Sequence, residues 1–191
     1  MLAHAMVGIA LVPEKKIVSL KEMFFVSFFF VLLAWSPDID YLINYLRGEP
    51  MPIRYTHSIG YISLMVLLSL LFRELFFRKY LKHIPILFFL FASSSHLFLD
   101  FLVGVHGNPY LYPFSSEVFV APFGILPSSG RIDIHNYYFW RNMTIEVAIF
   151  LPILLFSLRR FRTVILNSKL LMFLLGLSFI VGVMVGVGLE R

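Results

Sequence analysis

The sequence predicts an all-α protein: one integral membrane domain over residues 1–191, built as a polytopic transmembrane bundle of about five spans plus a short N-terminal helix. Three observations predict this fold. Hydrophobic residues make up 59% of the chain and charged residues only 14%, whereas an ordinary globular domain carries about 25% charged residues. Long apolar stretches recur along the chain. Basic residues gather at the ends of these stretches, so we expect membrane lipid and no nucleic acid as a partner.

The apolar stretches define the expected helices, because a span needs about 20 apolar residues. Residues 2–12 are too few for a span and lack the basic start of a signal peptide, so we expect a short helix that rests on its neighbours. The last helix holds Gly182 and Gly186 in a GxxxG pattern, which favours packing within the chain over dimerisation. The longer stretches are residues 17–35, 59–77, 84–105, 145–158 and 170–189.

Basic residues indicate the orientation. Segments 13–21, 78–83 and 159–169, together with Arg73, hold 11 of the 16 Lys and Arg residues. They alternate with two longer segments, 36–57 and 104–143. The positive-inside rule places the basic side in the cytoplasm. We therefore expect a multi-pass protein of the cell membrane whose two long segments lie on the extracytoplasmic side.

Ionisable residues inside or beside the apolar stretches point to a metal site. Each would cost about 3 kcal/mol at the centre of a bilayer. A divalent ion compensates this cost, because carboxylates and neutral imidazoles neutralise the cation as they lose water. The chain has no cysteine, so any ligands come from His and Asp, which suits one to three ions of zinc or, alternatively, manganese. The residues are His4, Asp38, Asp40, His57, His96 and Asp100.

Their spacing favours one shared site built from residues 1–106. His96 and Asp100 stand at i and i+4, hence on one face of a helix. Asp38 and Asp40 follow Pro37, and in an extended turn both carboxylates would point the same way. His57 directly precedes its helix. Helix rise counted from the basic edge gives similar heights for these residues: about 16 Å for His4 from Lys15, 25 Å for Asp38 from Lys21, 21 Å for His96 and 27 Å for Asp100 from Lys82, and 31 Å for His57 from Arg78.

The same residues carry a family resemblance. The motifs "AHAMVG", "SPDIDY", "RYTHS" and "SHLFLDFLVGVHGNPYLYPFSSE" cover most of residues 1–117. In this order they resemble a family of membrane-bound metal-dependent hydrolases that includes the LexA-binding, inner-membrane-associated proteins of bacteria. Two positions depart from the family pattern: Pro52 and Tyr41 stand where many members have His. A second metal is therefore less expected here than in those members.

The order of motifs is also distantly similar to the zinc-dependent phospholipase C and P1 nuclease group. This resemblance implies a phospholipase C-like phosphoesterase and adds His106, ten residues after His96, and Glu146 as candidate ligands. Asn142 stands where that group has a further His. A loop histidine and a glutamate near a helix start are the alternative interpretations of His106 and Glu146.

Together these features predict metal-assisted hydrolysis of a phosphoester in a lipid-like substrate. The ion would lower the pKa of a bound water towards 7. Asp38 is the preferred general base or bridging carboxylate, and its role and that of Asp40 are interchangeable at this point. Arg54, Arg131 and Arg141 lie in the two long segments and could bind phosphate oxygens.

Two other functions compete with hydrolysis. A metal- or proton-coupled transporter would carry polar residues along the full depth of several helices, whereas the last two helices here are nearly free of them. A non-catalytic membrane interaction protein would use a structural metal, and a closed site with four protein ligands would favour it.

Overall fold

The protein is all-α, as the computed structural model of residues 2–13, 17, 19–48, 53–128 and 133–189 shows. The extended pairing seen in this part of the chain is one isolated bridge between Asn108 and Phe119. The helices are α1 (Leu2–Ala10), α2 (Leu20–Trp35), the 3-10 helix η2 (Ser36–Asp38), α3 (Ile39–Arg47), α4 (Ile59–Leu75), α5 (Arg78–Leu81), α6 (Ile86–Val103), α7 (Tyr137–Ser157), α8 (Arg159–Leu166) and α9 (Lys169–Val187).

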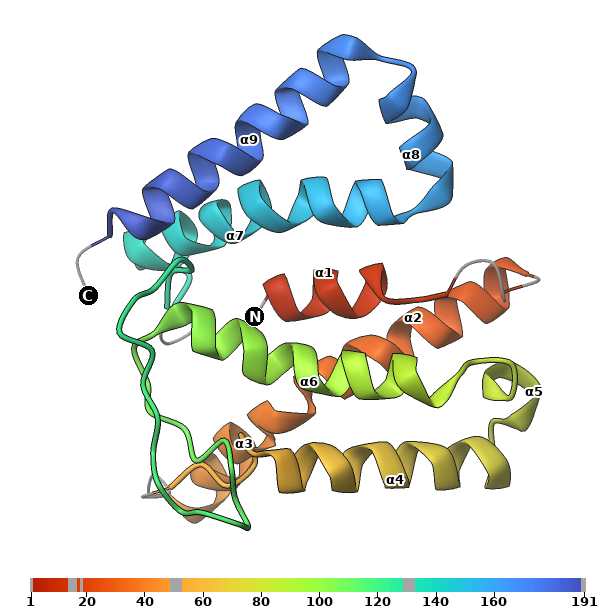
Figure 1. The fold of residues 1–191 in the computed structure, drawn as a ribbon, viewed down its shortest axis with the longest axis vertical. Helices are drawn as coiled ribbons and strands as arrows, with labels where there is room; N and C mark the ends of the chain where they lie inside the picture. The colour runs from red at the N-terminus through yellow and green to blue at the C-terminus, as the bar shows by residue number, and fades with distance from the viewer. Residues whose placement is uncertain (1, 14–16, 18, 49–52, 129–132, 190–191) are drawn as a thin grey trace.

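Helices α2, α4, α6 and α7 form one bundle, and α9 slants away from α7 towards α8 (Figure 1). Helix α6 packs between α2 and α4, and the short α1 packs against α2, α6 and α7. Helix α9 contacts α7 at the edge of the molecule. The segment that links α6 to α7 runs across one end of the bundle, where α6 ends and α4 and α7 begin. The basic α5 and α8 lie at the other end, because each follows the last turn of a long helix.

Several helices can cross a membrane. Among the described residues, four segments are long and apolar enough: Leu20–Arg47, Ile86–Val103, Tyr137–Ser157 and Lys169–Val187. The fifth expected span forms α4, whose 17 residues have a length of about 25 Å. The short N-terminal helix is α1, and it rests on its neighbours as the length of its apolar stretch predicted.

Two boundaries differ from the expectation. Helix α3 lies inside segment 36–57, where we expected an extended turn and a loop. Its nine residues are too few and too polar to stand out as an apolar stretch, and Gly48 ends it with a φ of 75°. Helix α7 begins at Tyr137, two turns before Ile145, because polar and aromatic residues form its first turns under the Asn136 side-chain cap.

The GxxxG pattern of α9 packs within the chain. A Cβ added at Gly182 would come within 2.8 Å of Ile149 Cγ1 on α7. A Cβ at Gly186 would overlap the carbonyl oxygen of Ile125, which precedes α7 in the linking segment. These glycines therefore let α9 approach its neighbours closely, which supports intrachain packing.

Backbone hydrogen bonds hold the linking segment against the bundle. The first two N–H groups of α4, at Ile59 and Gly60, donate to the carbonyls of Tyr110 and Tyr112 at 2.9 and 3.0 Å. Further along, the Ile125 N–H donates to the Leu102 carbonyl at 2.8 Å. The start of α4 is thus satisfied by protein groups, and the linking segment has a fixed place over this end of the bundle.

Candidate metal centre

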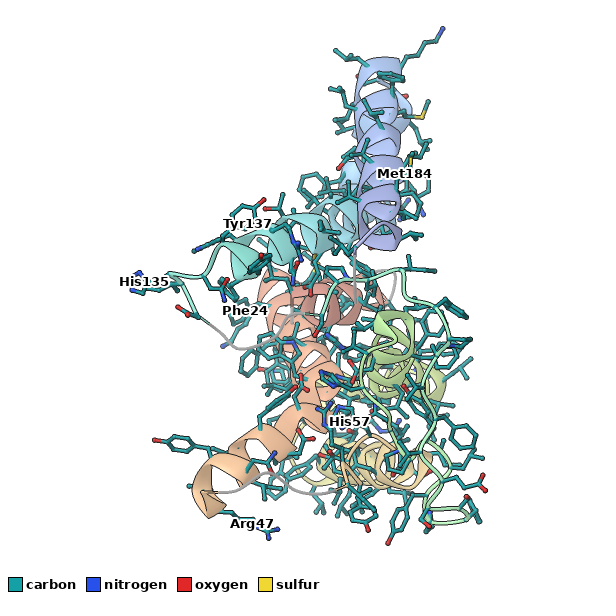
Figure 2. All side chains as sticks on the ribbon, turned by 90° about the vertical axis from the view of Figure 1, so that its left-hand side faces the viewer. Phe24, Arg47, His57, His135, Tyr137 and Met184 are labelled. Atoms are coloured by element: carbon teal, nitrogen blue, oxygen red, sulfur yellow. The ribbon has the colours of Figure 1, made fainter. Side chains whose placement is uncertain are left out.

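The ionisable residues predicted from the sequence meet at the end of the bundle that the linking segment covers. Figure 2 looks onto this end and shows His57 between α2–α3, α4 and α6. The cluster draws on four parts of the chain: the first turn of α1, the η2–α3 junction, the turn before α4, and the last two turns of α6. Its members are His4, Asp38, Asp40, Arg54, His57, His96 and Asp100.

Two fully buried imidazoles form the centre of the cluster. The Nε2 atoms of His57 and His96 lie 3.2 Å apart. His96 Nδ1 lies 2.7 Å from the Ala34 carbonyl oxygen, which can only accept, so the ring proton belongs on Nδ1. His57 Nδ1 lies 3.1 Å from Thr56 Oγ1, which can accept its proton in the same way. In these tautomers both Nε2 atoms present a lone pair to the same point.

A carboxylate completes a triangle with these nitrogens. Asp100 Oδ2 lies 3.2 Å from His57 Nε2 and 3.6 Å from His96 Nε2. Neighbouring ligands of a tetrahedral ion with bonds of about 2.0–2.1 Å are roughly 3.3 Å apart. Lone pairs and a carboxylate at these separations repel one another unless a proton or a cation lies between them. The spacing of the three atoms therefore allows them to bind a single ion.

Asp38 flanks this triangle on its more exposed side. Its Oδ1 lies 3.5 Å from His96 Nε2 and 3.8 Å from His57 Nε2. Its side chain is 23% exposed, whereas both imidazoles are fully buried. Asp38 can act as a fourth ligand, or it can accept a proton from a water at the fourth corner. Asp38, His57 and His96 form one of two groups, among the residues that the structure describes, whose atoms could hold a metal.

The second group consists of His4, His96 and Asp100. His4 Nε2 lies 3.5 Å from Asp100 Oδ1, whereas His57 approaches Asp100 Oδ2. The ring centroids of His4 and His96 are 4.1 Å apart. His4 is buried, and in the described part of the chain neither ring nitrogen has a hydrogen-bond partner. Glu146 holds this helix in place, because its Oε2 accepts from the Ala3 N–H at 3.0 Å.

Asp40 and Arg54 support the centre from one side. The fully buried Asp40 accepts from Arg54 Nε at 2.5 Å and lies 3.6 Å from His57 Nδ1. The outer nitrogens of Arg54 lie 3.4 Å from Asp38 Oδ1 and 3.9 Å from Asp100 Oδ2. The expected extended turn was wrong, because the η2–α3 junction is helical. Both carboxylates nevertheless face one cluster as expected: Asp38 lies near the Nε2 atoms of both imidazoles, and Asp40 pairs most closely with Arg54.

The cluster carries a residual negative charge. Three carboxylates and one guanidinium give −2 when the imidazoles are neutral. Uncompensated charge is costly at this depth, and one divalent cation would balance the cluster. The residues present therefore fit a metal ion in charge as well as in spacing.

Three other candidates lie apart from the cluster or outside the described residues. His106 is exposed in the linking segment and, within the described ranges, contacts none of the cluster residues. Arg141 donates to the Asn142 side chain at 3.0 Å and lies over the Tyr138 ring at 4.9 Å. Arg131 is outside the described residues.

Some residues of the site were not predicted as members. The Thr56 hydroxyl lies 3.1 Å from His57 Nδ1, and the place of Thr56 directly before that histidine was the available signal. The Ala34 carbonyl fixes the His96 ring, and a backbone group leaves no trace in the sequence. The Arg54 guanidinium lies over the Tyr41 ring, 5.0 Å from its centroid, and the ring helps to hold it. The two residues are far apart in the sequence, so no local spacing indicates this contact.

Comparison with known protein families gives a match over nearly the whole chain. The family described as YdjM inner membrane protein matches residues 1–187, which include every residue of the cluster and all four candidate spans. No curated protein and no solved structure matches the chain.

Proposed function

We propose that this chain, which belongs to the YdjM inner membrane protein family, is a membrane-embedded, metal-dependent hydrolase. In this proposal His57, His96 and Asp100 hold a divalent ion, with zinc as the preferred metal. The 3.2 Å approach of two buried Nε2 atoms, each with a lone pair, carries the proposal. Neutral imidazoles are placed this way when a cation lies between them.

The charge of the cluster supports one tightly held ion. A single divalent cation balances the −2 left by Asp38, Asp40, Asp100 and Arg54. His4 and the outer oxygen of Asp100 supply two further ligand atoms, 3.5 Å apart, for a second and weaker position. The proposal therefore requires one ion and allows another.

The residues around the ion have separate roles in hydrolysis. When bound, the ion would lower the pKa of a water towards 7 and polarise a phosphoryl oxygen. Asp38 Oδ1 accepts the proton of the attacking water, because it lies at the open side of the imidazole pair. Arg54 binds an anionic oxygen of the substrate with its outer nitrogens, while Asp40 holds its Nε. Arg141, which lies apart from the cluster, has no part in this scheme.

The location of the cluster supports a lipid phosphoester as the substrate. All its residues gather at one end of the bundle, and the basic α5 and α8 lie at the other end. The positive-inside rule then directs the site to the extracytoplasmic side. A transporter would need polar residues through the depth of several helices, whereas the described part of α9 has no ionisable residue beyond Lys169.

Metal analysis and lipid hydrolysis test this proposal together. Purified protein should contain about one bound divalent ion per chain, and it should release phosphate or a phosphoalcohol from a lipid panel with zinc or manganese. Asp38→Asn should retain the ion and lose activity, whereas Asp133→Asn, an exposed carboxylate in the linking segment, should retain both. Wild-type protein without a bound metal would end the proposal. Full activity of Asp38→Asn would refute the role of Asp38.

The same measurements separate catalysis from a purely structural metal. Cobalt in place of zinc reports the number of ligands through its absorption spectrum. An open fourth position, whose spectrum changes when inorganic phosphate is added, is expected for the hydrolase. A closed four-ligand site that phosphate does not perturb would favour the non-catalytic interaction protein.

A further inference from the structure

An exposed apolar stripe on α2 continues without interruption onto α3. Its members follow one another at intervals of three or four residues, so they lie on one face of the helical path. Because α2 lies within a candidate membrane span, its exposed apolar face is the face that contacts lipid. The stripe consists of Leu20, Phe24, Phe28, Leu32, Trp35, Ile39, Leu42 and Leu46.

Helix α3 lies crosswise at the site end of the bundle. Figure 2 shows it leaving the bundle sideways towards Arg47, and Figure 1 shows it at the end where α4 begins. The face that carries Asp40 is buried against the cluster, while the Leu46 side of the helix is exposed. The 16 residues of α2 rise only about 24 Å, so α3 begins at a depth that still lies inside a hydrocarbon core of about 30 Å.

The linking segment presents a second apolar surface beside the same site. Phe114 is 86% exposed and Leu111 is also exposed. The backbone here is fixed, because the Tyr112 carbonyl accepts a hydrogen bond from the Gly60 N–H. The ring centroids of Tyr112 and Tyr55 are also only 4.7 Å apart. A phenylalanine held in this position by a fixed backbone is unfavourable in water and favourable in a lipid leaflet.

The polar opening of the site lies beside these two apolar surfaces. Asp38, Arg54 and Asp100 are the partly exposed members of the cluster, with side chains 23%, 20% and 19% exposed. Asp38 lies at the junction that leads into α3, and Arg54 lies beside Tyr55, whose ring contacts the linking segment. A ligand that suits this arrangement has an anionic group that binds at the cluster and an apolar part that contacts α3 and the linking segment.

We infer that α3 and residues 111–114 are embedded in the lipid leaflet and that the site is entered from this leaflet by the anionic headgroup of a membrane lipid. The continuous stripe from α2 to α3 identifies lipid as the occupant, because α3 extends the lipid-facing surface of a membrane span. The use of the headgroup as a substrate rests on the proposed function; the embedding of the two segments does not.

Single-cysteine labelling tests the inference directly, because the chain has no cysteine of its own. Leu46→Cys and Phe114→Cys would each carry a bimane label in phosphatidylethanolamine–phosphatidylglycerol vesicles. Brominated acyl chains quench a label in the leaflet, and aqueous iodide quenches a label in water. Phe24→Cys, on the stripe of α2, is the lipid-exposed control, and Lys79→Cys, on α5 at the other end, is the water-exposed control.

The labels at Leu46 and Phe114 should follow the Phe24 control. We expect quenching by brominated lipid and a several-fold smaller response to iodide than at Lys79. Labels at either position that respond like the Lys79 control would overturn the inference. Zinc content measured in the same samples separates the two proposals. Bound zinc with labels in water refutes the lipid entry alone, and labels in lipid without bound zinc refute the metal site alone.

Discussion

The change Asp100→Asn tests the metal site with little change in side-chain volume. It replaces a carboxylate that contacts His4, Arg54, His57 and His96 with an amide that is a poor ligand. It also reduces the residual charge of the cluster from −2 to −1. Both effects weaken zinc binding. The matched control is Asp133→Asn, where the same substitution falls on an exposed residue outside the cluster.

The expected size follows from ligand linkage. Zinc at 100 times its Kd stabilises the folded state by about 2.7 kcal/mol. For a chain of this length that is a rise in Tm of about 5–10 °C. Loss of a residue that supports metal ligands from a distance weakens affinity by about 10–100-fold, and loss of a direct ligand should be at least as severe. A 100-fold loss leaves about 0.4 kcal/mol at the same zinc concentration, a rise in Tm of only about 1 °C.

Thermal unfolding followed by intrinsic tryptophan fluorescence in detergent measures this difference. Each protein is heated with zinc and with a chelator, and the two Tm values are subtracted, so any effect of the substitution on the metal-free fold cancels. Wild type and Asp133→Asn should gain the full shift, and Asp100→Asn should lose nearly all of it. A full shift in Asp100→Asn would refute the assignment of Asp100 as a ligand.

Three further predictions follow from the contacts around the site. Asp40→Asn should still bind one ion by calorimetry but about 10–100-fold more weakly, because Asp40 positions Arg54 and His57; a complete loss of binding would make Asp40 a direct ligand. Arg54→Ala should abolish the binding of inorganic phosphate to the zinc-loaded protein, whereas Arg141→Ala should not, and equal effects would contradict the role of Arg54. Gly186→Ala should destabilise the fold by about 1–3 kcal/mol in denaturant titrations, because its Cβ would overlap the Ile125 carbonyl. The control Gly176→Ala, which has open space around it, should be neutral or slightly stabilising. Similar losses of stability in both variants would refute close packing as the cause.

The cluster was predictable because polar residues in an apolar stretch are themselves the signal. His96 and Asp100 stand one helical turn apart in α6, and the distances from the basic residues placed His57 and Asp38 at a similar height. The structure brings these four side chains together. Local helix geometry and the thickness of the membrane were sufficient to predict this much.

The separate roles of Asp38 and Asp40 were not predictable in the same way. They depend on the helical η2–α3 junction, which forms where the sequence suggested an extended turn. They also depend on Arg54, which pairs with Asp40 from 14 residues away and is placed by tertiary packing. The Ala34 carbonyl that orients His96 is a backbone group, so no residue type marks it.

Anomalous diffraction from crystals of the zinc-loaded protein, recorded on both sides of the zinc absorption edge, tests the central claim most directly. We predict one strong peak between His57 Nε2, His96 Nε2 and Asp100 Oδ2, about 2.0–2.2 Å from each. Zinc found only on surface histidines such as His106, with no peak between the two buried imidazoles, would contradict the metal centre and the hydrolase proposed from it.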